Sequence, residues 1–129
     1  HLPEDIKKPY IDDAHKTITF ANRDMMELSI RALQLKNEGL GVKKRVSDPV
    51  FCERALHYIA WAEQNIIHLN DMVIAGTVQS WLWNRDTYPW TKVEEDRAHT
   101  EATGQGVQDD LNAVSDACKQ YAPSPKNYK

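Results

Sequence analysis

Histidine and carboxylate pairs at helical spacing are the first candidates for chemistry in this chain. The pairs, three or four residues apart, are Asp12 with His15, Asp96 with His99, and Glu95 with His99. Such spacing puts both side chains of a pair on one face of an α-helix, where they could bind a metal ion. Di-metal helical bundles, however, use Glu-x-x-His pairs from two helices, and the chain contains no such pair. We therefore expect these histidines to be solvated.

Two further histidines, His57 and His68, lie three helical turns apart among apolar residues. With His15 they are weak candidates for a metal or haem, although covalent haem attachment would need the missing Cys-x-x-Cys-His. We expect both to line the edge of the core, and we predict no cofactor.

The amino group and imidazole of His1 could chelate Cu(II) if this were a natural terminus. We favour a cleavage or cloning remnant there.

Nucleophilic catalysis needs a Ser, Thr or Cys paired with an oriented base, and no order or spacing in the chain indicates one. The segment SWLWNRDTYPW, residues 80–90, instead holds three of the four tryptophans. We expect Trp81 to continue a buried stripe and Trp83 to point away from that core. Exposed tryptophans beside an arginine are typical of protein interfaces. The predicted binding residues are Trp83, Arg85, Tyr88 and Trp90; the alternative is that these rings only cover a turn.

Three helices must position these groups. Apolar residues repeat at steps of three and four from Ile11 to Leu35, which predicts a helix from about Pro9 to Glu38, ended by Gly39 and Gly41. Asp48 and Pro49 are typical of a second helix start. Its apolar stripe keeps one phase to about Trp81, although Asn70-Asp71 and Gly76 are places where it could break.

The third helix is predicted to begin with a capping box formed by Thr91 and Glu94. Its first half is polar on nearly every face, so we expect it to extend past the core or face solvent. Val107, Leu111, Val114, Cys118 and Tyr121 restore an apolar stripe. No alternating strand pattern competes, and the chain is predicted to be one all-α domain, 1–129, with irregular tails at 1–8 and 122–129.

The two cysteines decide between two topologies. If residues 48–86 form one helix, the chain is an antiparallel three-helix bundle and Cys52 and Cys118 lie at the same end, where a disulfide is possible. If that helix breaks near Asn70-Asp71, a four-helix bundle results and the cysteines lie at opposite ends, too far apart to bond. We favour three helices with a disulfide, which indicates an exported, periplasmic or secreted protein.

Composition narrows the classes of function. The chain is 41% hydrophobic and 27% charged, with a net charge of −3, and is typical of a globular domain without a phosphate-binding face. Lys43-Lys44-Arg45 is expected to be a solvated loop, so we predict no nucleic acid partner. The longest stretch without charged side chains, residues 72–84, is too short for a membrane span.

From these patterns we expect a non-catalytic binding protein of the exported inhibitor, immunity or adaptor type. Its partner would be another protein, and a homodimer is possible because the second half of the second helix is apolar all round. The alternative is a bundle that holds a metal or small cofactor through His57, His68 or His15.

Overall fold

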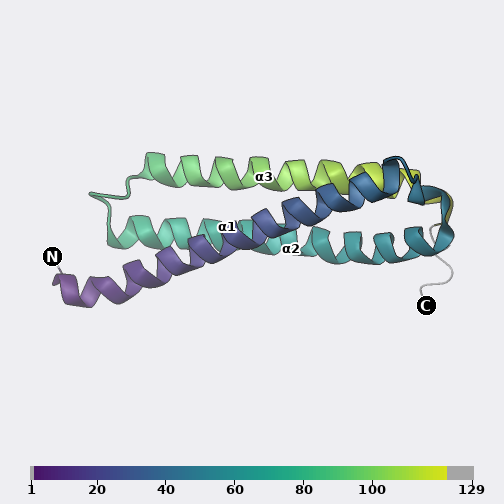
Figure 1. Ribbon diagram of the computed structural model, residues 1–129. Coiled ribbons are helices and arrows are strands. Elements are labelled where there is room, and N and C mark those ends of the chain that lie inside the picture. Colours follow the sequence, from purple (N-terminus) through teal and green to yellow (C-terminus); the bar gives the residue numbers. More distant parts are fainter. Residues whose placement is uncertain (1, 122–129) are drawn as a thin grey trace.

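The chain folds into three long packed helices, and the structure, a computed structural model, describes residues 2–121 (Figure 1). They are α1 (Glu4–Leu40), α2 (Pro49–Trp83) and α3 (Trp90–Ala117), with short 3-10 helices η1 (Arg45–Ser47) and η2 (Lys119–Tyr121). No strand occurs within residues 2–121, so the all-α prediction is confirmed. His1 and the predicted tail 122–129 lie outside the described residues.

Figure 1 shows an elongated bundle in which α2 and α3 run side by side in opposite directions while α1 crosses them obliquely. The beginning of α1 therefore lies at the same end as the turn between α2 and α3. The connection from α1 to α2 and the end of α3 lie together at the other end. Short connections between long helices favour this antiparallel arrangement of neighbours.

Helix α1 begins at Glu4, five residues earlier than the sequence predicts, so residues 4–8 are helical rather than irregular. The carbonyl of Pro3 accepts hydrogen bonds from the N–H groups of Ile6 and Lys7 at 3.1 and 3.2 Å. Acidic Glu4 and Asp5 occupy the first turn, where the positive end of the helix dipole favours them. The helix thus starts before Pro9, which lies inside it, although no side chain caps its first turn.

Helix α2 begins as predicted and does not break. Asp48 Oδ1 accepts a hydrogen bond from the Val50 N–H at 3.0 Å, and Pro49 occupies the first helical position. The helix continues through Asn70 and Asp71 to Trp83. This continuity excludes the four-helix alternative.

Gly76 permits a close approach of α1 to α2 instead of breaking α2. A β-carbon added at Gly76 would lie 2.8 Å from Ile18 Cγ1 and 3.3 Å from the Ala14 carbonyl oxygen. Real side chains do not approach that closely, so the crossing requires glycine at this position. Glycine destabilises the helix by about 1 kcal/mol relative to alanine, but it allows α1 and α2 to pack more closely.

The prediction for the start of α3 was wrong. Pro89 is the N-cap, no side chain caps the helix, and Thr91 lies within the first turn. The Pro89 carbonyl accepts hydrogen bonds from the N–H groups of Lys92 and Val93 at 2.9 and 3.3 Å. Because Pro89 is the N-cap and Trp90 is already helical, Thr91 lies two residues too late to act as the N-cap.

The polar first half of α3 packs into the bundle, contrary to the expectation that it extends past the core. Val93, Thr100 and Gly104 are buried. The Thr100 hydroxyl is within hydrogen-bond distance of Asn22 Oδ1 on α1, at 3.2 Å, and of the Asp96 carbonyl, at 3.0 Å. A buried polar group with hydrogen-bond partners carries little net cost. Small and hydrogen-bonded residues therefore take the place of a hydrophobic stripe here.

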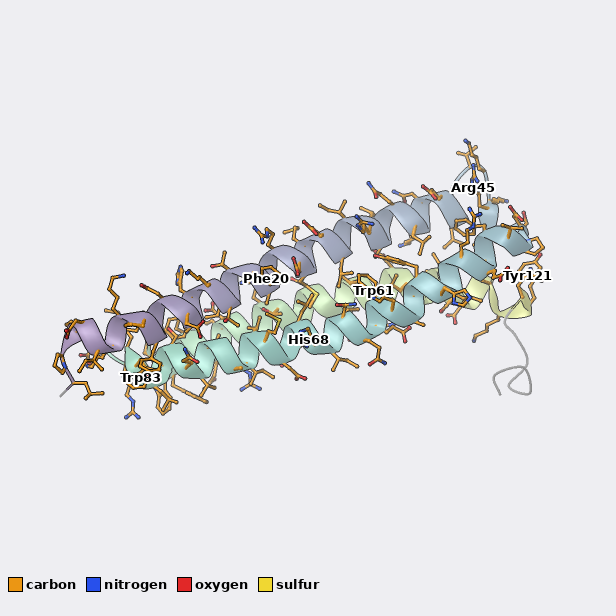
Figure 2. The ribbon with its side chains drawn as sticks, turned by 90° about the horizontal axis from the view of Figure 1, so that it is seen from below. Phe20, Arg45, Trp61, His68, Trp83 and Tyr121 are labelled. Carbon is orange, nitrogen blue, oxygen red and sulfur yellow. A yellow bond between two sulfur atoms is a disulfide. The ribbon has the colours of Figure 1, made fainter. Side chains whose placement is uncertain are left out.

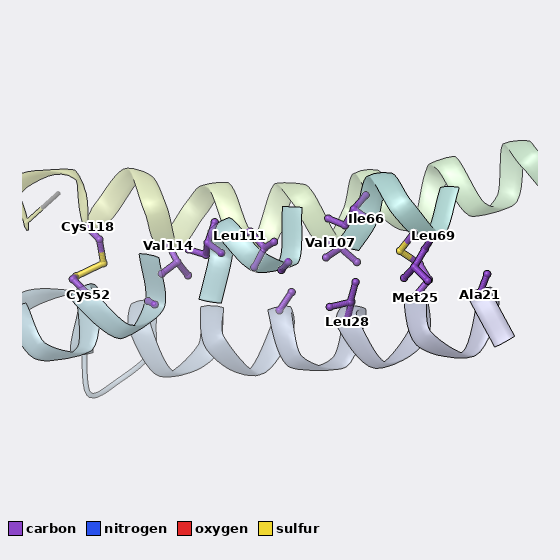
Figure 3. Packing of buried hydrophobic residues seen from close by; sticks show 14 of the residues in the cluster. Ala21, Met25, Leu28, Cys52, Ile66, Leu69, Val107, Leu111, Val114 and Cys118 are labelled. Atoms are coloured by element: carbon purple, nitrogen blue, oxygen red, sulfur yellow. A yellow bond between two sulfur atoms is a disulfide. The ribbon is translucent and has the colours of Figure 1, made fainter. Parts of the chain in front are cut away.

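The core is narrow and rich in small side chains, as Figure 3 shows. Alanines repeat along the buried faces of α1 and α2 at Ala14, Ala21, Ala32, Ala55 and Ala62. Larger residues fill the space between them: Met25, Leu28, Ile59, Ile66, Leu69, Val73, Val107, Leu111 and Val114. Such alternation of small and large side chains lets three helices interlock at close distance.

A disulfide joins Cys52 to Cys118 with a Cα–Cα distance of 5.4 Å (Figure 3). Both cysteines are fully buried, so the bond connects the start of α2 to the end of α3 inside the core. The predicted pairing is confirmed, and a disulfide is compatible with an oxidising compartment. Within residues 2–121, none of the helices has the length and apolar character that crossing a membrane requires.

Candidate functional site: the aromatic end

At the end of the bundle where α1 begins, side chains from all three helices form an aromatic cluster. We call this cluster the aromatic end and define it by Tyr10, Trp81, Trp83, Arg85, Tyr88 and Trp90. Figure 2 places Trp83 at this end, at the opposite extreme from Tyr121. The cluster includes the four predicted binding residues. The fold therefore places all four at one end of the bundle.

Trp83 stacks on Tyr10 of α1. The ring centroids are 4.3 Å apart and the ring planes differ by 7°. The sequence predicts that Trp83 points away from the side of α2 on which Trp81 meets the core. The oblique path of α1 brings Tyr10 against Trp83, so α1 partly covers this ring. Trp83 is consequently half-buried, while Tyr10 remains 47% exposed. The prediction placed Trp83 in solvent because periodicity within α2 does not reveal where α1 passes.

Trp81 holds the other half of the cluster together. Its ring meets the Trp90 ring edge to face, with centroids 5.0 Å apart and planes at 73°. The Arg85 guanidinium carbon lies 4.4 Å from the centroid of the Trp81 ring, in a cation–π contact. Arg85 is otherwise exposed, and Trp90 is 42% exposed. One guanidinium and one indole are thus held in place by Trp81 while both face solvent.

Tyr88 contacts α3 instead of extending the face of α2 that carries Trp81. Its hydroxyl donates a hydrogen bond to Asp96, a carboxylate that also lies 3.4 Å from Lys92 Nζ. Helix α2 ends at Trp83, so Tyr88 lies in the connection to α3. Desolvation raises the pKa of the Tyr88 hydroxyl well above its usual value, and the hydrogen bond to Asp96 and the negative charge of that carboxylate raise it further. Tyr88 therefore fixes the turn and stays neutral.

Exposed aliphatic side chains surround the aromatic end. Leu2, just before α1, and Ile6 on α1 precede Tyr10 at intervals of four residues, and Leu82 precedes Trp83 on α2. Leu2, Ile6 and Leu82 are each about half exposed. A groove of about 240 Å³ lies between these segments. Its lining comprises Glu4, Lys7, Leu82, Trp83, Asn84, Arg85 and Asp86.

Sequence reasoning missed the contribution of α1 to this surface. Leu2, Ile6 and Tyr10 repeat every four residues, and this repeat was an available signal. It was overlooked because residues 1–8 were expected to be irregular. With these side chains the surface comprises the beginning of α1, the end of α2, the connection after it and the first residue of α3.

The histidines are not brought together. His15, His57, His68 and His99 are all exposed, so His57 and His68 do not line the core edge as expected. No group of three or more His, Cys, Asp or Glu side chains suited to a metal ion occurs in the described part of the chain. The basic residues Lys43, Lys44 and Arg45 are exposed in the connection between α1 and α2.

The aromatic end offers rigid rings, an oriented guanidinium and half-exposed aliphatic side chains around a shallow groove. These groups suit contact and burial more than bond-making chemistry. Comparison of the chain with protein-family models, with curated proteins and with solved structures found no match.

Proposed function

We propose that the chain is a non-catalytic binding protein that recognises another protein through the aromatic end. The observation that carries the proposal is the arrangement of Trp90 and Arg85, both immobilised against Trp81 yet exposed. Tryptophan and arginine are enriched among the residues that dominate protein–protein binding energy. Side chains already held in one position lose less conformational entropy on binding.

The surrounding surface supports the same proposal. Ile6, Tyr10 and Leu82 supply half-exposed apolar area at the same end of the bundle. The groove beside Trp83 gives a partner side chain a place to enter. Contiguous exposed apolar area of this kind is typical of interaction sites.

The scaffold supports the type of binding protein that we propose. A small disulfide-linked bundle suits an oxidising compartment, so we propose a periplasmic or secreted inhibitor, immunity or adaptor protein. Trp81, Trp83 and Trp90 lie on helices, and the short connection between α2 and α3 carries Arg85 and Tyr88. Interfaces held in place in this way move little on binding, as in protease–inhibitor complexes.

Alanine variants at the two anchors test the proposal. A partner is first isolated by capture on immobilised wild-type protein from the compartment in which the chain is found, then purified. Its affinity is measured by surface plasmon resonance for wild type, Trp90→Ala and Arg85→Ala. We expect each variant to bind at least tenfold more weakly, in the range of interface hot spots.

Ile30→Ala is the matched control, because Ile30 is an exposed apolar residue on α1, 51% exposed, that belongs to neither the cluster nor its groove. It should bind within about twofold of wild type, a difference below 0.5 kcal/mol. Circular dichroism establishes that all variants keep their helical content. Affinities of Trp90→Ala and Arg85→Ala equal to that of Ile30→Ala would contradict the proposal.

A further inference from the structure

A second groove lies halfway along the bundle, between α1 and α2 and far from the aromatic end. Its floor is formed by the buried residues Leu28 and Leu69, and its rim by Asp24, Glu27, Arg31, Trp61 and Asn65. The groove encloses about 290 Å³. Figure 2 shows Trp61 well separated from Trp83 along α2. We call it the central groove.

Trp61 gives the central groove an aromatic wall. Trp61 is one of the four tryptophans in the chain and is 57% exposed. One side meets the Tyr58 ring at a centroid distance of 5.7 Å, which limits the movement of the indole. Exposed tryptophan faces attract cations because the ring carries negative charge density on its face.

Within residues 2–121, the two carboxylates on the rim have no cationic partner at salt-bridge distance. Among residues 2–121, neither Asp24 nor Glu27 forms a salt bridge or a side-chain hydrogen bond. Arg31, four residues after Glu27 on α1, also forms none in that part of the chain. Asn65 also lines the groove, and its side-chain amide donates a hydrogen bond to the Trp61 carbonyl at 3.1 Å.

Arg31 is close enough to Tyr58 that its positive charge acts on the Tyr58 hydroxyl. Arg31 is thus at the Tyr58 end of the groove. Asp24 and Glu27 precede Arg31 on α1 and lie further from Tyr58, because α1 and α2 run antiparallel. The rim therefore carries two negative charges against one positive charge. The carboxylate side of the groove is the side on which a cation is favoured.

From this charge complementarity we propose that the central groove recognises a basic side chain, lysine or arginine, presented by a partner chain. The aliphatic stem would cover Leu28 and Leu69, the charged group would meet Asp24 and Glu27, and the face of Trp61 would add a cation–π contact. The Asn65 oxygen accepts one of the donated hydrogen bonds. This site is separate from the aromatic end and stands independently of the function proposed for it.

The probe is the peptide acetyl-Gly-Lys-Gly-amide, and its counterpart with norleucine keeps the stem but removes the charge. Binding is followed through the Trp61 indole N–H signal in ¹H–¹⁵N spectra, assigned by its loss in Trp61→Phe. We expect a saturable shift with the lysine peptide and a dissociation constant at least threefold higher with the norleucine peptide. Each exposed charge or cation–π contact accounts for about a two- to fivefold change.

Variants with opposite expected effects separate this proposal from nonspecific attraction. Asp24→Asn with Glu27→Gln should weaken lysine-peptide binding at least threefold, whereas Arg31→Gln should strengthen it about twofold because a competing cation is removed. The double control Glu53→Gln with Asp71→Asn removes the same charge from exposed residues that do not line the groove. It should leave binding unchanged.

Three results would overturn the proposal. Absence of a saturable Trp61 shift would mean that the groove is not a binding site. Equal affinity for the lysine and norleucine peptides would reduce the site to apolar contact. Equal weakening in the Asp24/Glu27 variant and in the Glu53/Asp71 control would assign the effect to net charge. None of these results bears on the aromatic end, whose test uses other variants.

Discussion

Loss of the Cys52–Cys118 disulfide should destabilise the bundle by a large share of its total stability. The bonded cysteines are 66 residues apart in sequence. In the chain-entropy model, opening a loop of that length removes about 4 kcal/mol of stabilisation. Domains of this kind have a total free energy of unfolding of about 5–15 kcal/mol. Because both cysteines are fully buried, substitution also changes core packing, so reduction and substitution must be compared.

Urea unfolding followed by circular dichroism at 222 nm measures the effect. With a urea dependence of about 1.5 kcal/mol per M, the unfolding midpoint of Cys52→Ala/Cys118→Ala should lie about 3 M below that of the oxidised protein. Reduced wild type, which keeps both sulfur atoms in the core, should show nearly the same shift. A shift below about 0.7 M in reduced wild type, equivalent to 1 kcal/mol, would refute the reasoning. So would alkylation of two free thiols in the native protein.

Three further predictions concern the same fold. Gly106→Ala should raise the free energy of unfolding by about 1 kcal/mol because nothing lies within 4 Å of the added carbon. The free energy of unfolding of Gly76→Ala should lie about 2 kcal/mol below that of Gly106→Ala because of the Ile18 contact. Equal urea midpoints of these two variants would contradict this. The raised pKa of Tyr88 implies that the unfolded state loses the tyrosine proton first, so stability should be constant below about pH 10 and fall as pH rises above it. Tyr88→Phe should flatten that fall in urea titrations between pH 8 and 11, and an unchanged slope would show that other groups cause it. Tyr10→Ala should lower the free energy of unfolding by about 1 kcal/mol through loss of the Trp83 stack, whereas Tyr10→Phe should preserve stability.

The sequence is sufficient to predict the helices that carry large apolar stripes. The steps of three and four in α1, and the uninterrupted phase of α2, gave the correct number of helices. Together with the cysteine positions they also gave the correct topology. These signals are strong because apolar side chains at those intervals, large or small, are buried together only by a helix that packs on one side.

The errors come from contacts that only the tertiary structure defines. Gly76 was treated as a possible break, because a glycine in a helix looks the same whether it weakens the helix or admits a neighbour. The polar half of α3 was placed in solvent because Thr100 and Gly104 carry no hydrophobic signal, although one has a hydrogen-bond partner on α1 and the other a close neighbour on α2.

The four predicted binding residues lie at one end of the bundle, but the sequence did not predict their contacts. Arg85 lies over Trp81 rather than beside an exposed Trp83, and Tyr10 joins the cluster from the other end of the sequence. Trp61, isolated in the sequence, carried no signal at all. Its position matters because α1 places Asp24 and Glu27 on the same groove.

Site-specific crosslinking tests the central claim, that the aromatic end binds a protein partner, most directly. A photoreactive phenylalanine is placed at position 90 in one variant and at position 30 in another, and both are illuminated in the compartment where the chain occurs. We predict a covalent adduct with one protein from position 90 and none from position 30. Equal adducts from both positions, or an adduct from position 30 alone, would contradict the claim.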